Sequence, residues 1–475
     1  MYNVRFHPVN NRPQPHVEMS MRFPLCLLLV CFVTAAIRAD ERPNIIYILL
    51  DDAGYGDLSC YGQQKFKTPN IDSLAKEGMR FTQHYSGSTV CAPTRCCLMT
   101  GLHTGHSYVR GNREVQPEGQ SPMPADIVTL PRLLRDAGYV TGAFGKWGLG
   151  APGSPSDPAE HFDLFFGYNC QRQAHTYYPG HLWNNFAKVP MDGKTHSADV
   201  IMNQSLKFIR KHHDRPFFVF LPTTIPHAAM HATDEYLEMF RGQFSEFDSK
   251  VGRYAKTETK NPIAAFAAMM TQVDAHVGQL MALLQELDID RNTLVMLSSD
   301  NGPHMEGGHD PKFFDSNGPL KGHKRDLYEG GIRAPLIARW PGKVPAGTTS
   351  DHISAHWDML PTFLELAQAN SQEATDGISM VNELMGKTSD QEKHDYLYWE
   401  FYERGGKKAA RFGDWKAVQL NINKNPDAPI EIYHLPSDIG EAKNVAAENP
   451  EKVELAKKAF ADAHTPSAFW KFGKR

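Results

Sequence analysis

A seven-residue stretch, CAPTRCC at positions 91–97, combines three cysteines, a proline and an arginine. Pro93 suits the first turn of a helix, where its missing N–H loses no hydrogen bond. The sequence therefore predicts a helix that begins near Cys91, with Cys91 and Arg95 one turn apart on the same face. A helix N-terminus favours anions, and an arginine beside it suits a tetrahedral oxyanion such as sulfate or phosphate. Such a terminus also favours a low-pKa thiolate, while a disulfide, a metal ligand and a buried core residue remain open interpretations of Cys91.

A second group of polar side chains follows the ends of two predicted strands: Asp51 and Asp52 after residues 44–50, and Asp300 and Asn301 after residues 293–297. If both strands belong to one sheet, four oxygen donors meet at one point, and such a set suits Ca²⁺ or Mg²⁺. The alternative is that the acids only cap the turns that follow. A thiolate is a soft ligand that does not suit this hard cation, so the residues alone leave the role of Cys91 open.

Strands and helices must position these residues. Five short apolar runs are typical of strands buried on both faces, and they span residues 44–50, 139–144, 217–221, 293–297 and 335–339. Helical patterns lie between them, the clearest at 262–288, where apolar residues recur every three or four positions. The alternation predicts an α/β fold with a large, mostly parallel sheet sandwiched by helices, whose sites lie beyond the carboxyl ends of the strands.

The pattern changes after about residue 370. Runs at 396–401, 407–420 and 431–435 predict an antiparallel set, and 451–463 predicts a closing helix. We therefore expect three parts, which are an N-terminal extension with a signal peptide at 1–40, a catalytic domain at 41–370 and a smaller C-terminal α+β subdomain with an antiparallel sheet at 371–475.

The composition and the N-terminus indicate the surroundings in which the chain works. A formal net charge of −4 over 475 residues does not indicate a basic surface that would bind nucleic acid or a membrane. A basic start, a short apolar run and small residues near 21–39 predict a signal peptide and hence an exported protein, periplasmic or secreted, with a retained membrane anchor as the alternative. Cleavage would leave five cysteines, an odd number, so at least one is unpaired or chemically special.

The stretch Cys91-Ala92-Pro93-Thr94-Arg95, followed by Leu98-Met99-Thr100-Gly101, resembles the C-x-P-x-R…T-G signature of the type I sulfatases, an arylsulfatase-like family of the alkaline phosphatase superfamily. Further segments resemble the family's motifs in the same order, and they are Arg42 through Asp57, Gly145-Lys146-Trp147, Pro226-His227, Ser299-Asp300-Asn301-Gly302, and Lys324 with Tyr328-Glu329-Gly330-Gly331. The resemblance implies an alkaline phosphatase-like fold. It also implies that a maturing, formylglycine-generating enzyme oxidises Cys91 to Cα-formylglycine. The hydrated aldehyde presents oxygen instead of sulfur, which removes the mismatch with a hard cation.

The resemblance also implies a role for each matching residue. One Ca²⁺ would be held by Asp51, Asp52, Asp300, Asn301 and the modified Cys91. Arg95 would steady the formylglycine hydrate, Lys146 and Lys324 would bind the sulfate oxygens, and His227 would protonate the leaving alcohol.

One position departs from the family pattern. Many relatives carry a histidine two residues after the motif lysine, and Gly148 occupies that place here. The missing imidazole removes a hydrogen-bonding group, and His304 is the candidate that we expect to substitute for it.

The stretch from Asn169 to Trp183 is rich in aromatic and hydrogen-bonding side chains, as sugar sites are. We expect the substrate-binding residues there to be Arg172, His175, His181 and Trp183, with an ordinary buried loop as the alternative.

The sequence therefore predicts a sulfuric ester hydrolase that removes sulfate from a sulfated carbohydrate or an aryl sulfate. Two alternatives remain, namely a phosphomonoesterase or phosphodiesterase of the same superfamily and an inactive saccharide-binding relative. Cys91 within C-x-P-x-R argues against the first alternative, because phosphatase relatives use Ser or Thr nucleophiles with two zinc ions. Gly148 is the only hint of the second.

Overall fold

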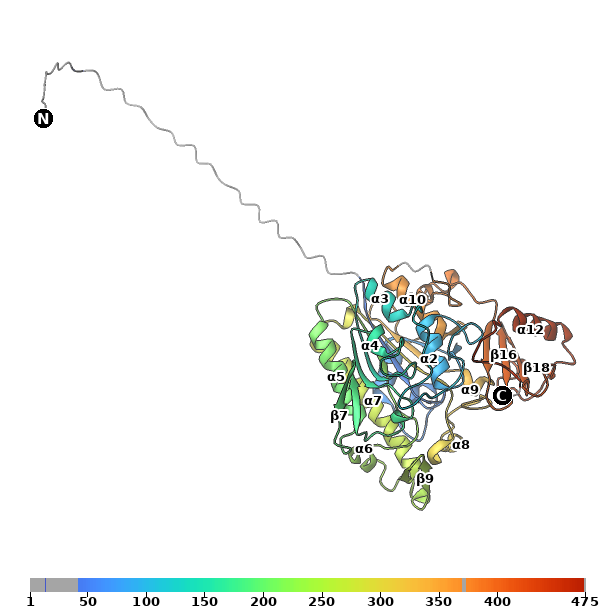
Figure 1. Cartoon of the computed structure of the whole chain (residues 1–475), viewed down its shortest axis with the longest axis horizontal. Helices are drawn as coiled ribbons and strands as arrows, with labels where there is room; N and C mark the ends of the chain where they lie inside the picture. The colour runs from blue at the N-terminus through green and yellow to red at the C-terminus, as the bar shows by residue number, and fades with distance from the viewer. Residues whose placement is uncertain (1–12, 14–41, 370–372, 474–475) are drawn as a thin grey trace. The chain divides into compact units, whose positions relative to one another are not determined.

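The largest element is a ten-stranded mixed sheet, seen in a computed structural model that describes residues 13, 42–369 and 373–473 (Figure 1). Its order is β13 (Thr348–Ser350), β2 (Met79–Phe81), β12 (Leu336–Arg339), β11 (Thr293–Ser299), β1 (Asn44–Leu50), β8 (Phe217–Pro222), β4 (Val140–Lys146), β5 (Leu164–Tyr168), β6 (His181–Asn184) and β7 (Ala187–Pro190). The five strands from β11 to β5 are parallel to one another. The predicted strand at 335–339 pairs antiparallel with β11, as β6 does with β5, so the sheet is mixed at both margins.

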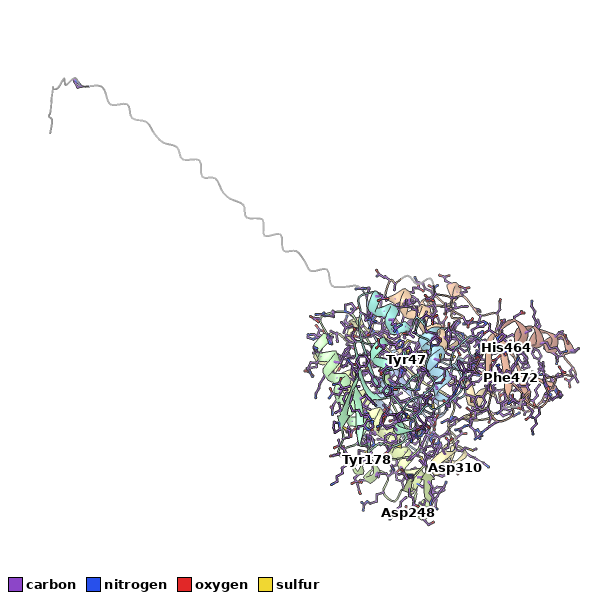
Figure 2. All side chains as sticks on the ribbon, viewed as in Figure 1. Tyr47, Tyr178, Asp248, Asp310, His464 and Phe472 are labelled. Atoms are coloured by element: carbon purple, nitrogen blue, oxygen red, sulfur yellow. The ribbon has the colours of Figure 1, made fainter. Side chains whose placement is uncertain are left out.

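Both faces of the central strands are buried, because helices cover each of them. Ile46, Ile48 and Leu50 of β1 belong to one apolar core, which includes side chains from α1, α5 and α7. Ile45, Tyr47 and Leu49 alternate with them and belong to a second core on the opposite face, with side chains from α2, α3 and α10. Figure 2 labels Tyr47 within this second core. The apolar run 44–50 therefore reflects a strand between two helical layers, and the predicted sandwiched α/β fold is confirmed.

The helices of the described chain are α1 (Pro69–Glu77), α2 (Cys91–Thr100), α3 (Leu130–Asp136), α4 (Pro158–His161), α5 (Ser197–His212), α6 (Asp234–Glu238), α7 (Pro262–Glu286), α8 (Pro311–Phe314), α9 (Glu329–Ile332), α10 (Met359–Leu366), α11 (Val381–Leu384) and α12 (Pro450–Asp462). The long α7 matches the pattern predicted at 262–288. Two-stranded pairs are formed by β9 (Val251–Tyr254) with β10 (Thr257–Lys260) and by β3 (His84–Tyr85) with β14 (Ser354–Ala355). None of the helices in the described ranges is both long and apolar enough to cross a membrane.

A second sheet of four antiparallel strands follows, made of β15 (Leu397–Phe401), β16 (Lys407–Phe412), β17 (Trp415–Leu420) and β18 (Ile430–His434). The predicted run 407–420 is two strands, because Gly413 takes a positive φ of 56° and turns the chain between them. Helix α12 packs on this sheet, and near the C-terminus the Phe472 ring stacks on Tyr402 at 4.2 Å between centroids (Figure 2). The antiparallel sheet after residue 371 is therefore confirmed.

The predicted boundaries at residues 40 and 370 stay predictions. Residues 40–475 form one compact unit in their contacts, which includes both sheets. The predicted signal peptide at 21–39 lies outside the described residues.

Buried charges join the two sheets. Lys416 of β17 is fully buried, and its Nζ lies 2.7 Å from Glu329 Oε1 and 3.5 Å from Glu441 Oε1. Glu329 begins α9, and it also accepts from the Tyr85 hydroxyl at 2.6 Å and from Arg333 at 3.1 Å. The Tyr-Glu-Gly-Gly segment of the sequence thus anchors the four-stranded sheet to α9 and, through Tyr85, to β3.

Removing the cation from this network should destabilise the protein strongly. Lys416→Met leaves two buried carboxylates without their shared partner, and we expect the free energy of unfolding to fall by about 3–5 kcal/mol. Chemical denaturation followed by circular dichroism measures the change. The exposed lysine variant Lys424→Met is the control and should change stability by less than about 0.5 kcal/mol. A Lys416→Met protein as stable as wild type would contradict the anchoring role.

Candidate active site

The predicted acidic pairs meet at the carboxyl ends of two neighbouring strands. β1 and β11 are parallel and in register, with Leu50 opposite Ser299, so the residues that follow the two strands lie side by side. The backbone N–H of Asp300 donates to Leu50 O at 3.0 Å, and that of Asp52 donates to Asp300 Oδ1 at 3.0 Å. The register of the sheet therefore brings both pairs together, and all four side chains are buried.

Helix α2 presents its first turn to these carboxylates. Cys91 is the first residue of the helix, and its Sγ lies 3.3 Å from Asp51 Oδ1 and 3.9 Å from Asp52 Oδ1. One turn later, the Arg95 guanidinium donates to Asp300 Oδ2 at 2.9 Å. The i, i+4 spacing places both side chains on one face, as the sequence predicts, and all ten residues of α2 are buried.

Two lysines approach the same carboxylates from other elements. Lys146 is the last residue of β4, and its Nζ lies 2.6 Å from Asp51 Oδ2. Lys324 lies in the loop before α9, and its Nζ is 2.7 Å from Asp52 Oδ2 and 3.2 Å from His227 Nε2. The structure thus brings together every residue to which the sequence assigns a catalytic or metal-binding role.

Three carboxylates and three cationic side chains meet in this buried cluster. Burial is the largest influence and by itself would raise the pKa of Asp51, but Lys146, Arg95 and Lys324 together outweigh it and hold that pKa below its usual value. Asp300 differs, because burial and the neighbouring Asp51 raise its pKa to about 7. The lysines and Arg95 therefore do not fully offset the repulsion between Asp300 and the other carboxylates. A cation bound among the three carboxylates would offset it.

The donor set fits a hard divalent cation. The Asn301 amide donates from Nδ2 to Asp52 Oδ1 at 2.7 Å, whereas its Oδ1 is buried and has no hydrogen-bond partner among the described residues. Ligand atoms of Asp51, Asp52, Cys91 and His227 all lie within 4.8 Å of one another. Carboxylate and amide oxygens are the ligands that Ca²⁺ prefers, and the Asn301 oxygen is left available for such an ion.

The environment of Cys91 disfavours a thiolate. Burial, with Asp300 and Asp51 nearby, raises the pKa of the Cys91 thiol well above its usual range. The low-pKa thiolate favoured by the helix N-terminus is therefore absent, because burial and, after it, two carboxylates outweigh the helix end. The five cysteines of the described ranges are all free, so a disulfide of Cys91 is excluded as well.

Two aromatic rings pack against His227, whose Nε2 lies 3.4 Å from Asp52. The His175 ring lies parallel to it, with 4.3 Å between centroids and 2° between planes. Tyr254 of β9 meets both imidazoles edge-on, at 5.2 Å from His175 and 5.6 Å from His227. Sequence reasoning missed Tyr254, since the β9–β10 hairpin carries no motif. Of the predicted substrate-binding residues, His175 therefore lies next to the reaction centre.

Of the other residues predicted to bind substrate, His181 and Trp183 belong to β6, and Arg172 lies in the segment between β5 and β6. Trp183 Nε1 donates to Glu118 Oε1 at 2.7 Å, and His181 Nε2 lies 3.1 Å from the same carboxylate. Arg172 is exposed and pairs with Glu114 at 2.5 Å. Each of these side chains already has a protein partner, so their contact with substrate stays a prediction.

Both ring nitrogens of His304 are occupied by backbone groups. Its Nε2 lies 3.1 Å from Pro226 O, and its Nδ1 accepts from the Glu306 N–H at 3.1 Å. Its ring is 5.7 Å from that of His227. A role for His304 in place of the imidazole missing at Gly148 therefore requires one of these bonds to break, and it stays a prediction.

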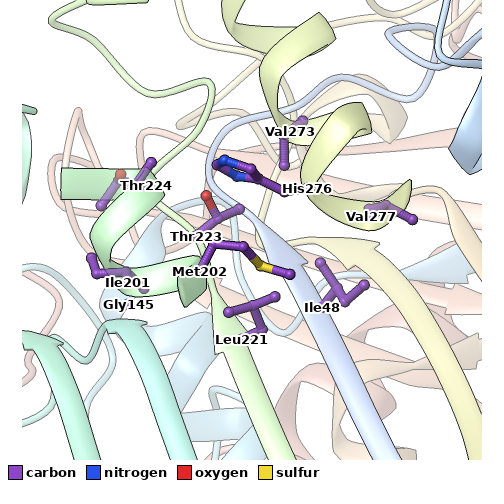
Figure 3. A pocket seen from close by; sticks show the side chains of 11 residues that line it. Ile48, Gly145, Ile201, Met202, Leu221, Thr223, Thr224, Val273, His276 and Val277 are labelled. Atoms are coloured by element: carbon purple, nitrogen blue, oxygen red, sulfur yellow. The ribbon is translucent and has the colours of Figure 1, made fainter. Parts of the chain in front are cut away.

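A separate small cavity lies beside Gly145, lined by residues of α5 and α7 (Figure 3). Its lining is mostly apolar and includes Ile48, Met202 and Val277. The one imidazole in it, His276, is hydrogen-bonded to Asp199 at 2.8 Å. None of the predicted catalytic side chains lines this cavity, so it is a packing feature next to the site.

The comparisons with known proteins agree with this geometry. The family profile described as Sulfatase matches residues 43–369, more than half of the chain. The chain belongs to the sulfatase family. A second profile, N-sulphoglucosamine sulphohydrolase, C-terminal, matches residues 322–462 of this sulfatase. The enzyme class, sulfuric ester hydrolase, and the alkaline phosphatase-like fold predicted from the sequence are thereby confirmed.

Individual relatives span most of the chain. N-acetylgalactosamine-6-sulfatase of Canis lupus familiaris is 32% identical over 388 residues, which cover 76% of this chain and 70% of that protein. N-acetylgalactosamine-6-O-sulfatase of Bacteroides thetaiotaomicron is 27% identical and covers 87% of this chain and 91% of its own length. The crystal structure of Ps i-CgsB in complex with k-i-k-neocarrahexaose aligns with a TM-score of 0.76 at 27% identity, covering 90% of this chain and 95% of that one.

The loop after the acidic pair is held by a buried carboxyl. Asp52 has a positive φ of 69°, and Asp57 Oδ2 accepts from the Gly54 N–H at 2.7 Å. Asp57 Oδ1 is buried and has no hydrogen-bond partner among the described residues. Burial raises the pKa of Asp57 from its ordinary value of 3.8 to about 7. The folded protein therefore keeps a proton here that the unfolded chain loses above about pH 4.

This proton gives stability a specific pH dependence. Because the folded pKa is raised, its contribution is fully present below about pH 4 and is lost as pH rises through 7. Relative to Asp57→Asn, which cannot ionise, we expect the free energy of unfolding of wild type to fall by about 1.4 kcal/mol for each pH unit between about pH 4 and 7. Urea unfolding of both proteins across this range, with a chelator present, measures the difference. Parallel stability curves would contradict the assignment.

Proposed function

We propose that this sulfatase removes sulfate from a sulfated carbohydrate or an aryl sulfate, using a formylglycine hydrate derived from Cys91. The observation that carries the proposal is the position of Cys91 Sγ, 3.3 Å from Asp51 Oδ1 and inside a buried cluster of carboxylates and cations. A neutral thiol at that position is a poor nucleophile and a poor ligand for a hard cation. A hydrated aldehyde carries oxygen at the same point, and oxygen suits both roles.

The residues that fit one Ca²⁺ are Asp51, Asp52, Asp300 and Asn301, together with the oxygen of the modified residue 91. Calcium bound there would lower the pKa of a hydrate hydroxyl and add positive charge to a cluster whose own charges are balanced. A cluster with net positive charge favours an anionic sulfate ester over a neutral ester.

The remaining residues bind and orient the sulfate. Lys146 Nζ and Lys324 Nζ lie on either side of the acidic pair, within 2.7 Å of its oxygens, and are placed to contact sulfuryl oxygens. Arg95 is fixed by Asp300 and by Lys146 O at 2.5 Å, so its guanidinium stays beside residue 91 as charge moves. Donors held in place before the reaction stabilise developing charge without reorganising.

Bond making and bond breaking then follow from these positions. One hydroxyl of the residue 91 hydrate gives its proton to a neighbouring carboxylate of the cluster as its oxygen attacks sulfur, and the S–O bond to the alcohol breaks. His227 delivers a proton from Nε2 to the departing alkoxide oxygen. The second hydroxyl of the hydrate then returns a proton to His227 Nε2, its oxygen forms the aldehyde C=O, and the C–O bond to the bridging oxygen breaks, so sulfate leaves with that oxygen. Water then adds to the aldehyde and restores the hydrate.

The state of His227 depends on the substrate. Its Nδ1 bonds to Ala228 O, which leaves Nε2 facing Lys324 and Asp52. Burial, followed by Lys324, lowers the pKa of His227 well below its usual range, so the ring is neutral in the free enzyme. The negative charge of a bound sulfate ester is what favours protonation at Nε2.

Sulfated carbohydrate is the substrate class that we favour. Relatives at 27–32% identity are named for N-acetylgalactosamine 6-sulfate, and the structure with a TM-score of 0.76 was solved with k-i-k-neocarrahexaose. In this chain, the rings of His181 and Trp183 of β6 lie edge-on at 6.0 Å between centroids, and Trp183 donates to Glu118; we propose that this aromatic pair contacts the sugar. We further propose that the protein is exported, periplasmic or secreted, and is matured by a formylglycine-generating enzyme.

Replacing the proposed nucleophile should abolish turnover without unfolding the protein. We expect Cys91→Ala to lower kcat for sulfate release by at least about 10⁴-fold. The matched control is Cys97→Ala on the same helix, which should retain activity because Cys97 is a core residue. Peptide mass analysis of active wild type should show residue 91 converted to the aldehyde. An active preparation with intact thiol, or phosphate released faster than sulfate from matched esters, would contradict the proposal.

The predicted cation should stabilise the fold through its ligands. Addition of Ca²⁺ at about 100 times its Kd to chelator-treated enzyme should stabilise it by about 2.7 kcal/mol, seen as a rise in Tm, and should restore activity. Asp300→Asn should lose most of this rise, whereas the exposed control Asp427→Asn should keep it. Equal Tm shifts in both variants would place the ion elsewhere.

A further inference from the structure

Three buried amide side chains line the loops around Gly148. Asn169, Gln171 and Gln120 are 1%, 5% and 4% exposed. Gln120 Nε2 donates to Gln171 Oε1 at 2.9 Å, which joins two of them. The remaining atoms Gln171 Nε2, Gln120 Oε1 and Asn169 Oδ1 are buried without a hydrogen-bond partner among the described residues. One donor and two acceptors are thus available within one small region.

Gln171 lies directly against the strand end that carries Lys146. The backbone N–H of Gly148 bonds to Asn169 O at 3.3 Å. A Cβ added at Gly148 would meet Gln171 Nε2 at 2.9 Å, and Gly148 has a positive φ of 76°. The Gln171 amide therefore occupies the space that a side chain at position 148 would take, two residues beyond the Lys146 ammonium.

The two loops that hold the amides also border the reaction centre. Four residues after Gln171, the same loop places His175 on the ring of His227. The loop that carries Gln120 also contains Asn112, whose Oδ1 accepts from the Ala92 N–H at 3.1 Å, next to Cys91. The amide pair thus lies in the two loops that run between the start of α2, the end of β4 and His227.

The chemistry of the pair is neutral. Sulfate oxygens are matched by the cations Lys146, Lys324 and Arg95, whereas an amide carries no charge and offers both a donor and an acceptor, as an uncharged sugar group does. A donor beside acceptors fits a sugar hydroxyl or a carboxamide. Buried polar atoms in native proteins are almost always paired, so this set calls for a ligand or an ordered water.

We propose that Gln171, held by Gln120, is a specificity-determining residue that donates from Nε2 to a neutral oxygen of the saccharide next to the sulfated position. This inference rests on the proposed sulfatase activity toward sugars. An uncharged group that satisfies a buried donor discriminates strongly against an analogue lacking it, because the donor would otherwise remain unpaired.

The test compares two kinds of substrate in one pair of enzymes. Gln171→Met keeps the length of the side chain and removes its polar atoms. We expect its kcat/KM to fall about 10–100-fold for the sulfated hexose or hexosamine that wild type hydrolyses fastest, and to change less than about threefold for 4-nitrophenyl sulfate. A sugar substrate that lacks the neighbouring hydroxyl or acetamido group should show the same fall of about 10–100-fold in kcat/KM with the wild-type enzyme. With Gln171→Met, removing that group from the substrate should lower kcat/KM little further.

Stability separates this role from a structural one. Gln171→Met alone should lower Tm, because the buried Gln120 Nε2 loses its acceptor. The double variant Gln120→Met/Gln171→Met removes both amides, so its Tm should be unchanged or higher, and its substrate preference should match that of the single variant. The control Gln419→Met removes a buried amide that is bonded to Ala428 O, and it should lower Tm while leaving the substrate preference intact.

Two results would overturn the inference while leaving the sulfatase activity in place. They are equal losses on sugar and aryl sulfates, or full activity on the sugar. The proposed function fails separately, if wild type releases sulfate from neither substrate.

Discussion

The active site depends on a buried ionic cluster in which three carboxylates face three cationic side chains around one cysteine. Such a cluster is costly to desolvate, and removal of any single member leaves a partner uncompensated. Its geometry is set by backbone register, because Asp51 and Asp300 follow strands that are hydrogen-bonded neighbours. Lys146 ends a third parallel strand, and Cys91 and Arg95 begin a helix that is buried throughout. The sheet therefore acts as a rigid base that holds these charges in place away from water.

The rest of the fold can be understood as support for that base. Two apolar cores cover the two faces of β1, so neither Asp51 nor Asp52 can shift without moving a packed strand. Lys416 ties the second sheet to Glu329 of α9, the helix that follows the loop carrying Lys324. The Tyr-Glu-Gly-Gly motif, which accompanies a predicted catalytic lysine in the sequence, thus has a structural role beside the site.

Much of this was predictable from the sequence, for physical reasons. Runs such as 44–50 are apolar throughout because both faces are covered, and polar residues at their ends mark the edge where sites form. The i, i+4 spacing of Cys91 and Arg95 sufficed to place them together. Other features depend on long-range pairing that no local pattern encodes. The antiparallel direction of β12, the Tyr254 ring over two imidazoles, and the Gln120–Gln171 pair each join segments far apart in sequence. The direction of the Cys91 thiol pKa was also beyond local reasoning, since the helix end favours a thiolate, whereas burial in the assembled site and the carboxylates gathered there raise that pKa.

The central claim is that residue 91 offers oxygen, not sulfur, to a hard cation held by the two strand ends. A high-resolution crystal structure of enzyme produced with its maturing partner and soaked in calcium tests it most directly. The account predicts one ion bound by Asp51, Asp52, Asp300 and Asn301, with an oxygen of residue 91 completing the set at about 2.3–2.6 Å. A sulfur atom at that position in an active crystal, or an ion bound away from these four side chains, would contradict it.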